Sequence, residues 1–191
     1  MDPKLFNVYQ TIMGEINSHL TKTNQGHLSR ELSGETTFIG VALNNSFVNS
    51  IDDFTDCIQI KHHNDHEIDL ALMQTKNKEL PKSATIIKEK DYSTKINVGE
   101  MATIIGYPGG TVYQTKKGNA TELKAITNEG RISQKPGDKK VMYQVPTTHG
   151  ASGSPVFNSK GELIAINFSG FQLKQGFNNG ILAKYIDELI K

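Results

Sequence analysis

Residues 147–170 read TTHGASGSPVFNSKGELIAINFSG, a turn of small residues followed by two short apolar segments. Ser152 stands between Gly150-Ala151 and Gly153, so no bulky neighbour in the chain shields its hydroxyl. A turn of this kind also allows successive backbone N–H groups to converge on one point, as the stabilisation of an oxyanion requires. The stretch marks Ser152 as a candidate nucleophile, with the amides of Gly150 and Ser152 as its oxyanion hole. Taken by itself, this stretch is explained equally well as an ordinary loop of small residues.

The sequence around this stretch predicts an all-β protein. Short segments rich in apolar and β-branched residues are separated by Gly and Pro turns, which is typical of a sandwich or a pair of barrels. The expected strands are 56–62, 68–75, 83–89, 100–107, 122–133, 140–146, 154–159, 162–170 and 176–183. Upstream of them, TTFIGVAL and SFVNSI flank Asn44-Asn45 and predict a hairpin. Helical spacing of apolar residues predicts a helix over 3–16 and a docking helix in the tail AKYIDELIK.

Composition excludes several classes of protein. The chain has 21 Lys and Arg against 20 Asp and Glu, a formal net charge of +1, whereas a protein that coats nucleic acid needs a basic excess. No run of about eighteen apolar residues exists to span a bilayer. The single cysteine, Cys57, excludes an intramolecular disulfide, and His62 and His66 stand in an expected strand end and turn, a poor ligand set for a metal. We therefore expect no nucleic-acid or membrane partner, no metal or cofactor, and a monomer.

A carboxylate stands at the start of one expected strand. Asp69 opens the apolar run Leu70-Ala71-Leu72-Met73, so we expect it at the edge of the core, partly desolvated and in need of a partner. Such an acid suits the orientation of an imidazole in a catalytic triad. The alternative is an aspartate that caps a strand at the surface.

Taken together, three separate motifs resemble those of the trypsin-like serine peptidases. SGSPVFNSKGELIAI, with IGYPGG and IDLAL upstream, is most similar to the bacterial branch that contains the glutamyl endopeptidases and exfoliative toxins. The resemblance covers roughly residues 55–190 in the right order. It implies two antiparallel six-stranded barrels with the site in the cleft between them. On this chain it implies one peptidase unit made of an N-terminal helical and loop extension that contributes to the first barrel (1–34), a first barrel (35–92), and a second barrel with the C-terminal helix (93–191).

The resemblance also assigns roles to individual residues. The nucleophile falls on Ser152, the carboxylate on Asp69, and the oxyanion hole on the amides of Gly150 and Ser152. Ala151 replaces the Asn of most members but keeps the amide.

The residues expected to bind substrate surround the same turn. The resemblance places Thr147 in the primary specificity pocket, and Asn167 stands where this branch has a histidine, which puts a preference for acidic residues in doubt. His149 is a possible compensating donor. Strand 167–169, which includes Ser169, would offer backbone groups to an extended substrate.

The histidine is the least well-matched element of the expected triad. His27 lies 42 residues before Asp69, a separation typical of this branch, and has Thr23-Asn24 nearby. His19 lies 50 residues before Asp69 and is the reserve. In another register, the hairpin around Asn44-Asn45 would put Asp52 where the histidine belongs, and the chain would lack a base.

These alternatives give the chain more than one expected function. With a base present, the chain is a serine endopeptidase that hydrolyses peptide bonds through a Ser-His-Asp triad and an acyl-enzyme. Without a catalytic base, it is a catalytically inactive protease-fold protein that binds peptides or a protein partner through the cleft between the two expected barrels. A fragment whose first barrel is completed by another chain is a third reading. The N-terminus as given, MDPKLFNVYQTIMGE, shows no secretory signal, while the resemblance implies secretion.

Overall fold

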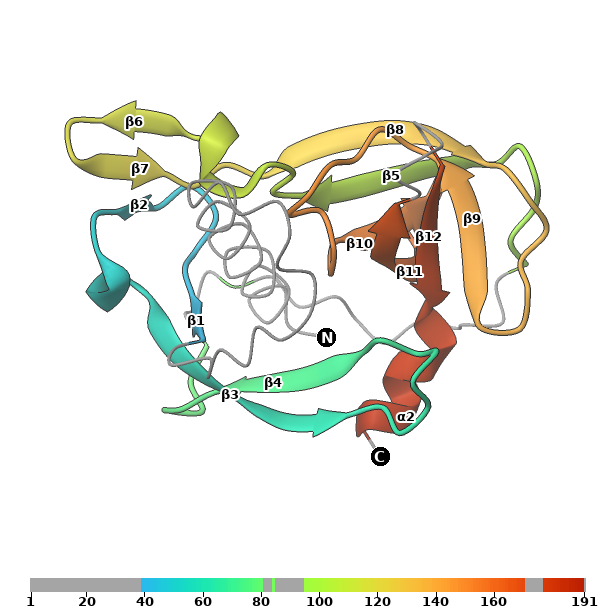
Figure 1. The fold of residues 1–191 in the computed structure, drawn as a ribbon, viewed down its shortest axis with the longest axis horizontal. Coiled ribbons are helices and arrows are strands. Elements are labelled where there is room, and N and C mark those ends of the chain that lie inside the picture. Colours follow the sequence, from blue (N-terminus) through green and yellow to red (C-terminus); the bar gives the residue numbers. More distant parts are fainter. Residues whose placement is uncertain (1–38, 81–83, 85–94, 171–176, 191) are drawn as a thin grey trace, which may run out of the picture.

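The computed structural model describes residues 39–80, 84, 95–170 and 177–190 (Figure 1). The described part is mostly β, and all of its strand pairs are antiparallel. Its one α-helix is α2 (Ile186–Ile190), which follows the short 3-10 helix η3 (Ala183–Tyr185) near the C-terminus. The all-β fold class and the C-terminal helix are confirmed, while the expected helix over 3–16 and strand over 83–89 fall outside the described residues.

Six strands form a closed barrel. In spatial order they are β10 (Pro155–Asn158), β11 (Leu163–Gly170), β12 (Asn178–Leu182), β9 (Lys140–Gln144), β8 (Ile126–Ile132) and β5 (Met101–Gly106). Buried and less buried residues alternate along β5 and β9, because one face of each strand lines the interior of the barrel. All six strands lie within 93–191, where the sequence predicts one of the two barrels.

The remaining strands form two small sheets that do not close into a second barrel within the described residues. One sheet joins β1 (Gly40–Val41), β3 (Thr55–His62) and β4 (Ala71–Thr75). The other joins β2 (Phe47–Val48) to the hairpin of β6 (Thr115–Lys117) and β7 (Ala120–Glu122). The division of the chain at 34 and 92 stays a prediction.

The predicted hairpin around Asn44-Asn45 is wrong, although the turn itself is present. β1 pairs with β3 and β2 pairs with β7, so the two flanking strands do not pair with each other. The physical reason lies in the turn: the Asn45 N–H donates to the Leu123 carbonyl at 2.6 Å, and the Ala125 N–H donates to Asn44 Oδ1 at 2.8 Å. Although Ser46 closes the turn on the Leu43 carbonyl, these bonds tie the turn to a distant segment, and the flanking strands pair with other partners.

Apolar contacts join the segment that carries Asp69 to the barrel. Ile68 and Leu70 are buried in the same cluster as the barrel interior, together with Tyr185, Ile186 and Leu189 of the tail. The tail therefore docks through its apolar face, as expected, except that Ile190 is exposed.

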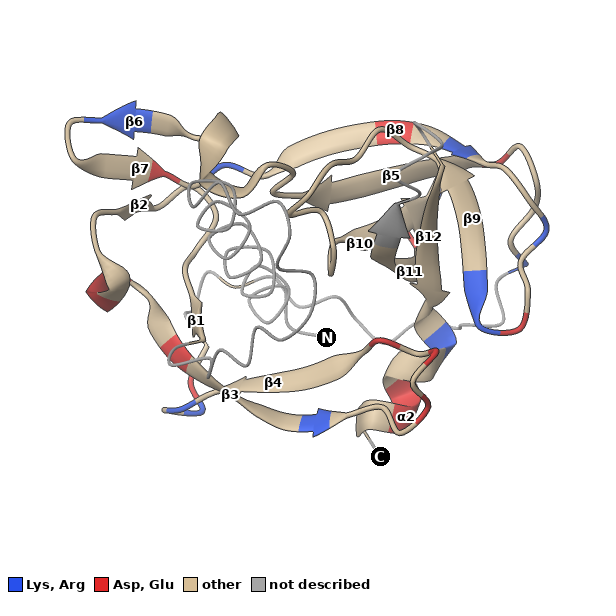
Figure 2. Ribbon diagram, viewed as in Figure 1, with Lys and Arg blue, Asp and Glu red and all other residues tan. Residues whose placement is uncertain are grey.

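Charged groups reinforce the same junction, as Figure 2 shows near α2. Lys139 pairs with Asp65 at 2.6 Å and with Glu67, and these hydrogen bonds raise the pKa of Lys139 and lower that of Asp65. The His63 Nε2 lies 3.1 Å from Glu188 Oε2. Exposed ion pairs contribute little stability individually, so we assign this network mainly to fixing the orientation of the 63–69 turn.

The close approach of two strands gives a prediction about stability. A Cβ at Gly130 in β8 would lie 1.8 Å from the Gln144 carbonyl oxygen of the next strand, and backbone cannot move aside cheaply. We expect Gly130→Ala to lower the free energy of unfolding by about 2–3 kcal/mol, measured by chemical denaturation. Gly137→Ala is the matched control, because its Cβ would meet only the Lys140 carbonyl at 3.7 Å. Equal stability of the two variants would contradict the prediction.

Candidate active site

The turn that carries Ser152 is held by a dense set of backbone hydrogen bonds. The Ala151 N–H donates to the Thr148 carbonyl at 3.0 Å, and the Ser154 N–H donates to the Ala151 carbonyl at 3.2 Å. The Gly153 N–H reaches across to the Asn167 carbonyl of β11 at 2.6 Å. The second half of the turn is therefore fastened to β11, which keeps Ser152 at a fixed place.

The first half of the turn is fastened to the GYPGG segment. The Gly109 N–H donates to the His149 carbonyl at 2.6 Å. Gly150 has φ 91°, which favours glycine, and a Cβ there would lie 2.8 Å from the Tyr107 carbonyl oxygen. Gly150 is thus required both by its backbone conformation and by the close approach of residues 107–110.

The hydroxyl of Ser152 is directed toward an irregular part of β11. Its Oγ donates to the Phe168 carbonyl at 3.3 Å, longer than a usual O–H···O bond and therefore weak. In β11 the pairing with β12 shifts between Asn167 and Ser169, so Phe168 is the extra residue of a β-bulge. A bulge of this kind re-aims backbone groups, and here it turns a carbonyl toward the candidate nucleophile.

Two amides of the Ser152 turn donate no hydrogen bond to any residue that the structure describes. Among the hydrogen bonds between described residues, neither the Gly150 N–H nor the Ser152 N–H is a donor. Gly150 is buried and Ser152 is partly buried, so unused donors at this place are costly unless a ligand accepts from them. The pair is suited to an oxyanion, as the sequence predicts, and its role stays a prediction.

Asn167 has structural partners at both ends of its amide. Its Oδ1 accepts from the Tyr143 hydroxyl at 2.7 Å, and its Nδ2 donates to the Ala151 carbonyl at 2.7 Å. The residue is only 3% exposed, and burial raises the pKa of Tyr143 well above its usual value. Sequence reasoning missed this chain of bonds. A lone amide inside the apolar run IAINF was the available signal, because a buried amide needs partners.

The other predicted substrate-binding residues lie around the turn. The Thr147 Oγ1 donates to Asn178 Oδ1 at 2.6 Å, and the Asn178 Nδ2 donates to the Val145 carbonyl, so Thr147 is fixed against β12. His149 is exposed. Ser169 belongs to β11 and pairs with Asn179 of β12, while its side chain lies outside the described part. Substrate binding by these residues and by Asn167 stays a prediction.

Asp69 lies at the edge of the core as expected, but it is exposed rather than partly desolvated. Its neighbours Ile68 and Leu70 are both buried, and the Leu70 N–H donates to the Ile68 carbonyl at 2.8 Å, so the chain turns tightly at Asp69 and leaves its side chain exposed. It has no hydrogen-bond partner among the residues that the structure describes.

The described histidines are not joined to Ser152 or Asp69 by a hydrogen bond. His63 is engaged elsewhere, with Glu188 at 3.1 Å and edge-on to the Tyr185 ring. His27 and His19 both fall outside the described residues. Asp52 is exposed in η1 (Ile51–Asp53), where its backbone N–H donates to the Ser50 hydroxyl. The described part also contains no group of three or more His, Cys, Asp or Glu that could hold a metal ion.

Tyr107, next to the turn, gives a prediction about pH. Its hydroxyl donates to Asn44 Oδ1 at 3.1 Å, and burial raises its pKa to about 12 from the usual 10.0. The unfolded chain therefore releases this proton first, and folding stability falls as pH rises from about 10 to about 12. We expect the loss of stability between pH 9 and pH 11, measured by denaturation, to be smaller in Tyr107→Phe than in the original chain. Equal losses would contradict the prediction.

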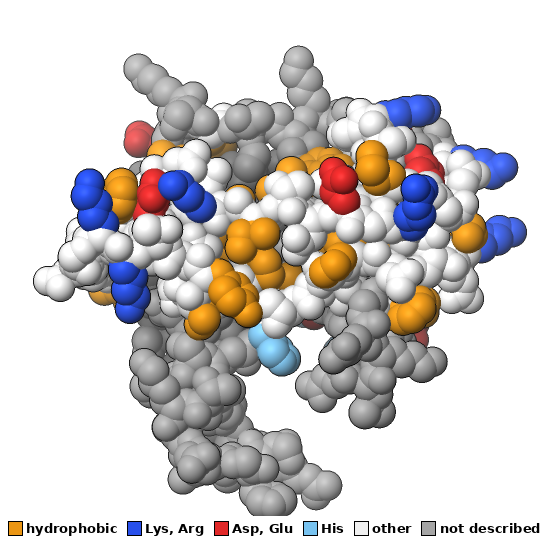
Figure 3. Space-filling model, turned by 90° about the horizontal axis from the view of Figure 1, so that it is seen from above, with side chains coloured by type: hydrophobic (Ala, Val, Ile, Leu, Met, Phe, Trp, Pro, Cys, Tyr) orange, Lys and Arg blue, Asp and Glu red, His pale blue; other side chains and the backbone are white. Residues whose placement is uncertain are grey.

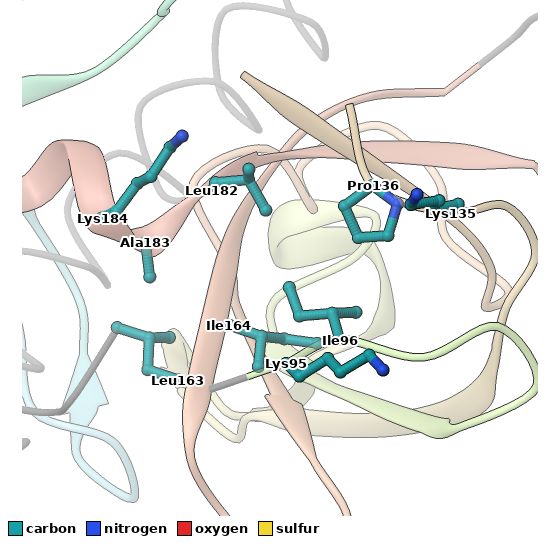
Figure 4. Close-up of a pocket in the computed structure, with 9 residues that line it drawn as sticks. All are labelled: Lys95, Ile96, Lys135, Pro136, Leu163, Ile164, Leu182, Ala183 and Lys184. Carbon is teal, nitrogen blue, oxygen red and sulfur yellow. The ribbon is translucent and has the colours of Figure 1, made fainter. Parts of the chain in front are cut away.

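A cavity of about 270 Å³ lies at the other end of the barrel (Figure 4). It is lined by Lys95, Ile96, Lys135, Pro136, Leu163, Ile164, Leu182, Ala183 and Lys184. Strand β11 begins beside this cavity at Leu163 and runs to Phe168 beside Ser152. The cavity is therefore separate from the candidate active site.

A comparison with known protein families agrees with this site and this fold. The site is a serine turn with two amides that donate to no described residue, and it lies next to a closed six-stranded barrel. A family model described as a trypsin-like peptidase domain matches residues 18–166. The chain belongs to this family. The resemblance seen in the sequence is thereby confirmed, and so is membership of the serine hydrolases. The match includes Ser152 and Asp69 and begins just before His19 and His27.

Curated relatives fall into two groups. A probable periplasmic serine endoprotease, DegP-like, of Pseudomonas putida strain GB-1 is 35% identical over 129 residues, which cover 66% of this chain and 24% of the relative. A glutamyl endopeptidase of Staphylococcus epidermidis is 34% identical over 110 residues, covering 58% and 32%. One of Staphylococcus aureus strain MW2 is 30% identical over 131 residues, covering 65% and 35%. The chain thus matches only about a quarter to a third of the length of these trypsin-like relatives.

Within the described residues, no helix is long and apolar enough to cross a membrane.

Proposed function

We propose that this trypsin-like chain is a serine endopeptidase that cleaves peptide bonds in protein or peptide substrates. The observation that carries the proposal is the Ser152 turn, in which the amides of Gly150 and of Ser152 itself donate to no described residue. Membership of the peptidase family and the names of both groups of relatives support the same reaction.

In the proposed mechanism Ser152 Oγ gives up its weak bond to Phe168 and attacks the carbonyl carbon of the substrate. A histidine takes the hydroxyl proton, and the amides of Gly150 and Ser152 donate to the oxyanion that forms. The histidine then protonates the leaving amine, and water releases the acyl group by the same steps. We assign the role of this histidine to His27, with His19 as the alternative. We propose that Asp69 orients its ring.

An extended substrate would pair with the backbone of β11 beyond the bulge. Thr147 and His149 stand close in sequence to the nucleophile, and we propose them as substrate contacts. Asn167 can contact substrate only if its hydrogen bond to Tyr143 or to Ala151 is broken. We therefore propose a smaller contribution to substrate binding for Asn167 than for Thr147 and His149. We further propose that the chain acts outside the cytoplasm, for which the word periplasmic in the name of one group of relatives is the support. The expected monomer stays a prediction.

A fluorophosphonate probe tests the proposal, because it forms a covalent bond only with an activated serine. We expect labelling of the original chain and its loss in Ser152→Ala. Loss in His27→Ala, with labelling kept in His19→Ala, assigns the base to His27, and the reverse assigns it to His19. Absence of labelling in the original chain would contradict the proposal and favour a protein that only binds peptides.

A further inference from the structure

The cavity at the far end of the barrel is lined by aliphatic side chains and lysines only. Six of its nine lining residues are aliphatic or proline, and the other three are Lys95, Lys135 and Lys184. Its volume of about 270 Å³ lies just below the usual range for drug-sized ligands. At about 30 Å³ for each water-sized group, the cavity holds about nine such groups. It therefore suits a small molecule.

The floor of the cavity belongs to the core of the barrel. Leu163 and Ile164 begin β11, Leu182 ends β12, and all three are buried in the main apolar cluster. Ile96 is partly buried and packs against the same cluster. The Leu182 N–H also donates to the Lys139 carbonyl at 2.9 Å, which fixes the end of β12. The apolar surface is thus formed before any ligand binds.

Two of the three lysines have no counter-charge among the residues that the structure describes. Lys184 donates to Asp138 Oδ1 at 3.2 Å, and this bond raises the pKa of Lys184. Lys95 and Lys135 are exposed, and their ammonium groups form no ion pair and no hydrogen bond with a described residue. Figure 4 shows these two lysines at one end of the cavity and Lys184 at the other. One end of the cavity therefore carries uncompensated positive charge.

Elsewhere on the described surface, several lysines are accompanied by acidic residues. On the face seen in Figure 3, basic and acidic side chains lie side by side in several places. Lys124 pairs with Glu122 at 2.9 Å, and Lys76 pairs with Asp56 at 2.7 Å. The net charge of the whole chain is only +1, so a lining with lysines and no acidic residue is a local feature. Its charge complements an anionic group, and lysine binds both carboxylate and phosphate as a point charge.

We infer that this cavity binds a small anionic amphiphile, an aliphatic chain of about eight carbons with one carboxylate or phosphate head group. The chain packs on Ile96, Ile164 and Leu182, and the head group lies between Lys95 and Lys135. This binding site goes beyond the proposed function and does not depend on it, because the cavity is separate from the Ser152 turn.

The test is calorimetric titration of the original chain with four ligands of the same chain length, each below the concentration at which it forms micelles. Octanoate and octyl phosphate carry a negative head group, octanol carries none, and octylamine carries a positive one. We expect the two anions to bind at least about tenfold more tightly than octanol or octylamine. The tighter of the two anions identifies the head group. Equal binding of the anions and octanol would overturn the inference.

Chain length tests the apolar floor separately from the charge. Each buried CH₂ group raises affinity by up to about fourfold, so butanoate should bind at least about tenfold more weakly than octanoate. Affinity should stop rising for chains that exceed the cavity. Equal binding of butanoate and octanoate would show a response to charge alone and would contradict the site.

Substitution of the two unpaired lysines locates the binding. We expect Lys95→Gln and Lys135→Gln each to weaken octanoate binding by several-fold, and the double variant to bind octanoate no better than octanol. Lys116→Gln is the matched control, because Lys116 is also exposed but lies in β6 of a separate sheet. An equal loss in Lys116→Gln would overturn the inference. All of these side chains are exposed, so each variant should unfold at the same denaturant concentration as the original chain.

The same titration of Ser152→Ala separates this inference from the proposed function. We expect this variant to bind octanoate as the original chain does. Unchanged binding in a chain that fluorophosphonate does not label would defeat the proposed function alone. Labelled protein that does not distinguish octanoate from octanol would defeat the inference alone.

Discussion

Replacement of Ser152 by Ala is expected to lower kcat/KM for peptide hydrolysis by about four to six orders of magnitude. The reason is that the variant keeps the turn and the unused amides but has no oxygen to form the acyl-enzyme. What remains is the modest rate that binding and oxyanion stabilisation supply on their own. The turn is held by backbone bonds, so we expect Ser152→Ala to unfold at the same denaturant concentration as the original chain.

Ser154→Ala is the matched control, because it changes a serine two residues away in the same segment. Ser154 is completely buried, and its Oγ has no hydrogen-bond partner within the described part of the chain. Removal of a buried hydroxyl without a partner relieves a desolvation cost, so this variant should be as stable as the original chain or more so. We expect it to keep activity. Loss of activity in Ser154→Ala but not in Ser152→Ala would show that the nucleophile is assigned wrongly.

The sequence predicts the closed barrel well because its strands carry a local signal. Apolar and polar residues alternate in segments such as 100–107 and 140–146, and Gly or Pro turns separate the expected strands from one another. Each of the six barrel strands falls within a segment that the sequence predicts as a strand, because each buries one face in a common core.

Pairings between distant segments were not predictable in the same way. Nothing local in 46–51 indicates that β2 pairs with β7, some seventy residues later. The β6–β7 hairpin was missed because Lys116 and Lys117 conceal the strand pattern. The turn at Gly118-Asn119, with φ 64° at Gly118, was the signal that could have revealed it.

For the candidate site, local chemistry was the more reliable guide. The small residues around Ser152 indicated a tight turn, and the structure has a turn there, while the convergence of its amides stays a prediction. The exposure of Asp69 was not foreseen, since it depends on which neighbours the barrel buries. Both candidate histidines, His27 and His19, lie outside the described part, so His27 still rests on its spacing from Asp69 and on the nearby Thr23-Asn24.

Replacement of Asn167 by Leu is expected to have the largest effect on stability. Leu fills a similar volume but leaves the buried Tyr143 hydroxyl without its partner, and it leaves the Ala151 carbonyl with only the Ser154 N–H at 3.2 Å. An unpaired buried hydroxyl costs about 1–3 kcal/mol and the lost bond to Ala151 about 1 kcal/mol, so we expect the free energy of unfolding to fall by about 3 kcal/mol in chemical denaturation. Stability equal to that of the original chain would contradict the role given to Asn167.

A double variant separates the two bonds of Asn167. In Asn167→Leu with Tyr143→Phe no hydroxyl remains unpaired, so the double variant should be more stable than the sum of the two single losses predicts. The Ala151 carbonyl still lacks the bond from Asn167, and Ala151 directly precedes the nucleophile. We therefore expect fluorophosphonate labelling of Ser152 to stay about tenfold or more slower in the double variant, because a small displacement of a nucleophile is costly. Recovery of stability together with slow labelling would show that Asn167 positions the turn as well as stabilising the barrel.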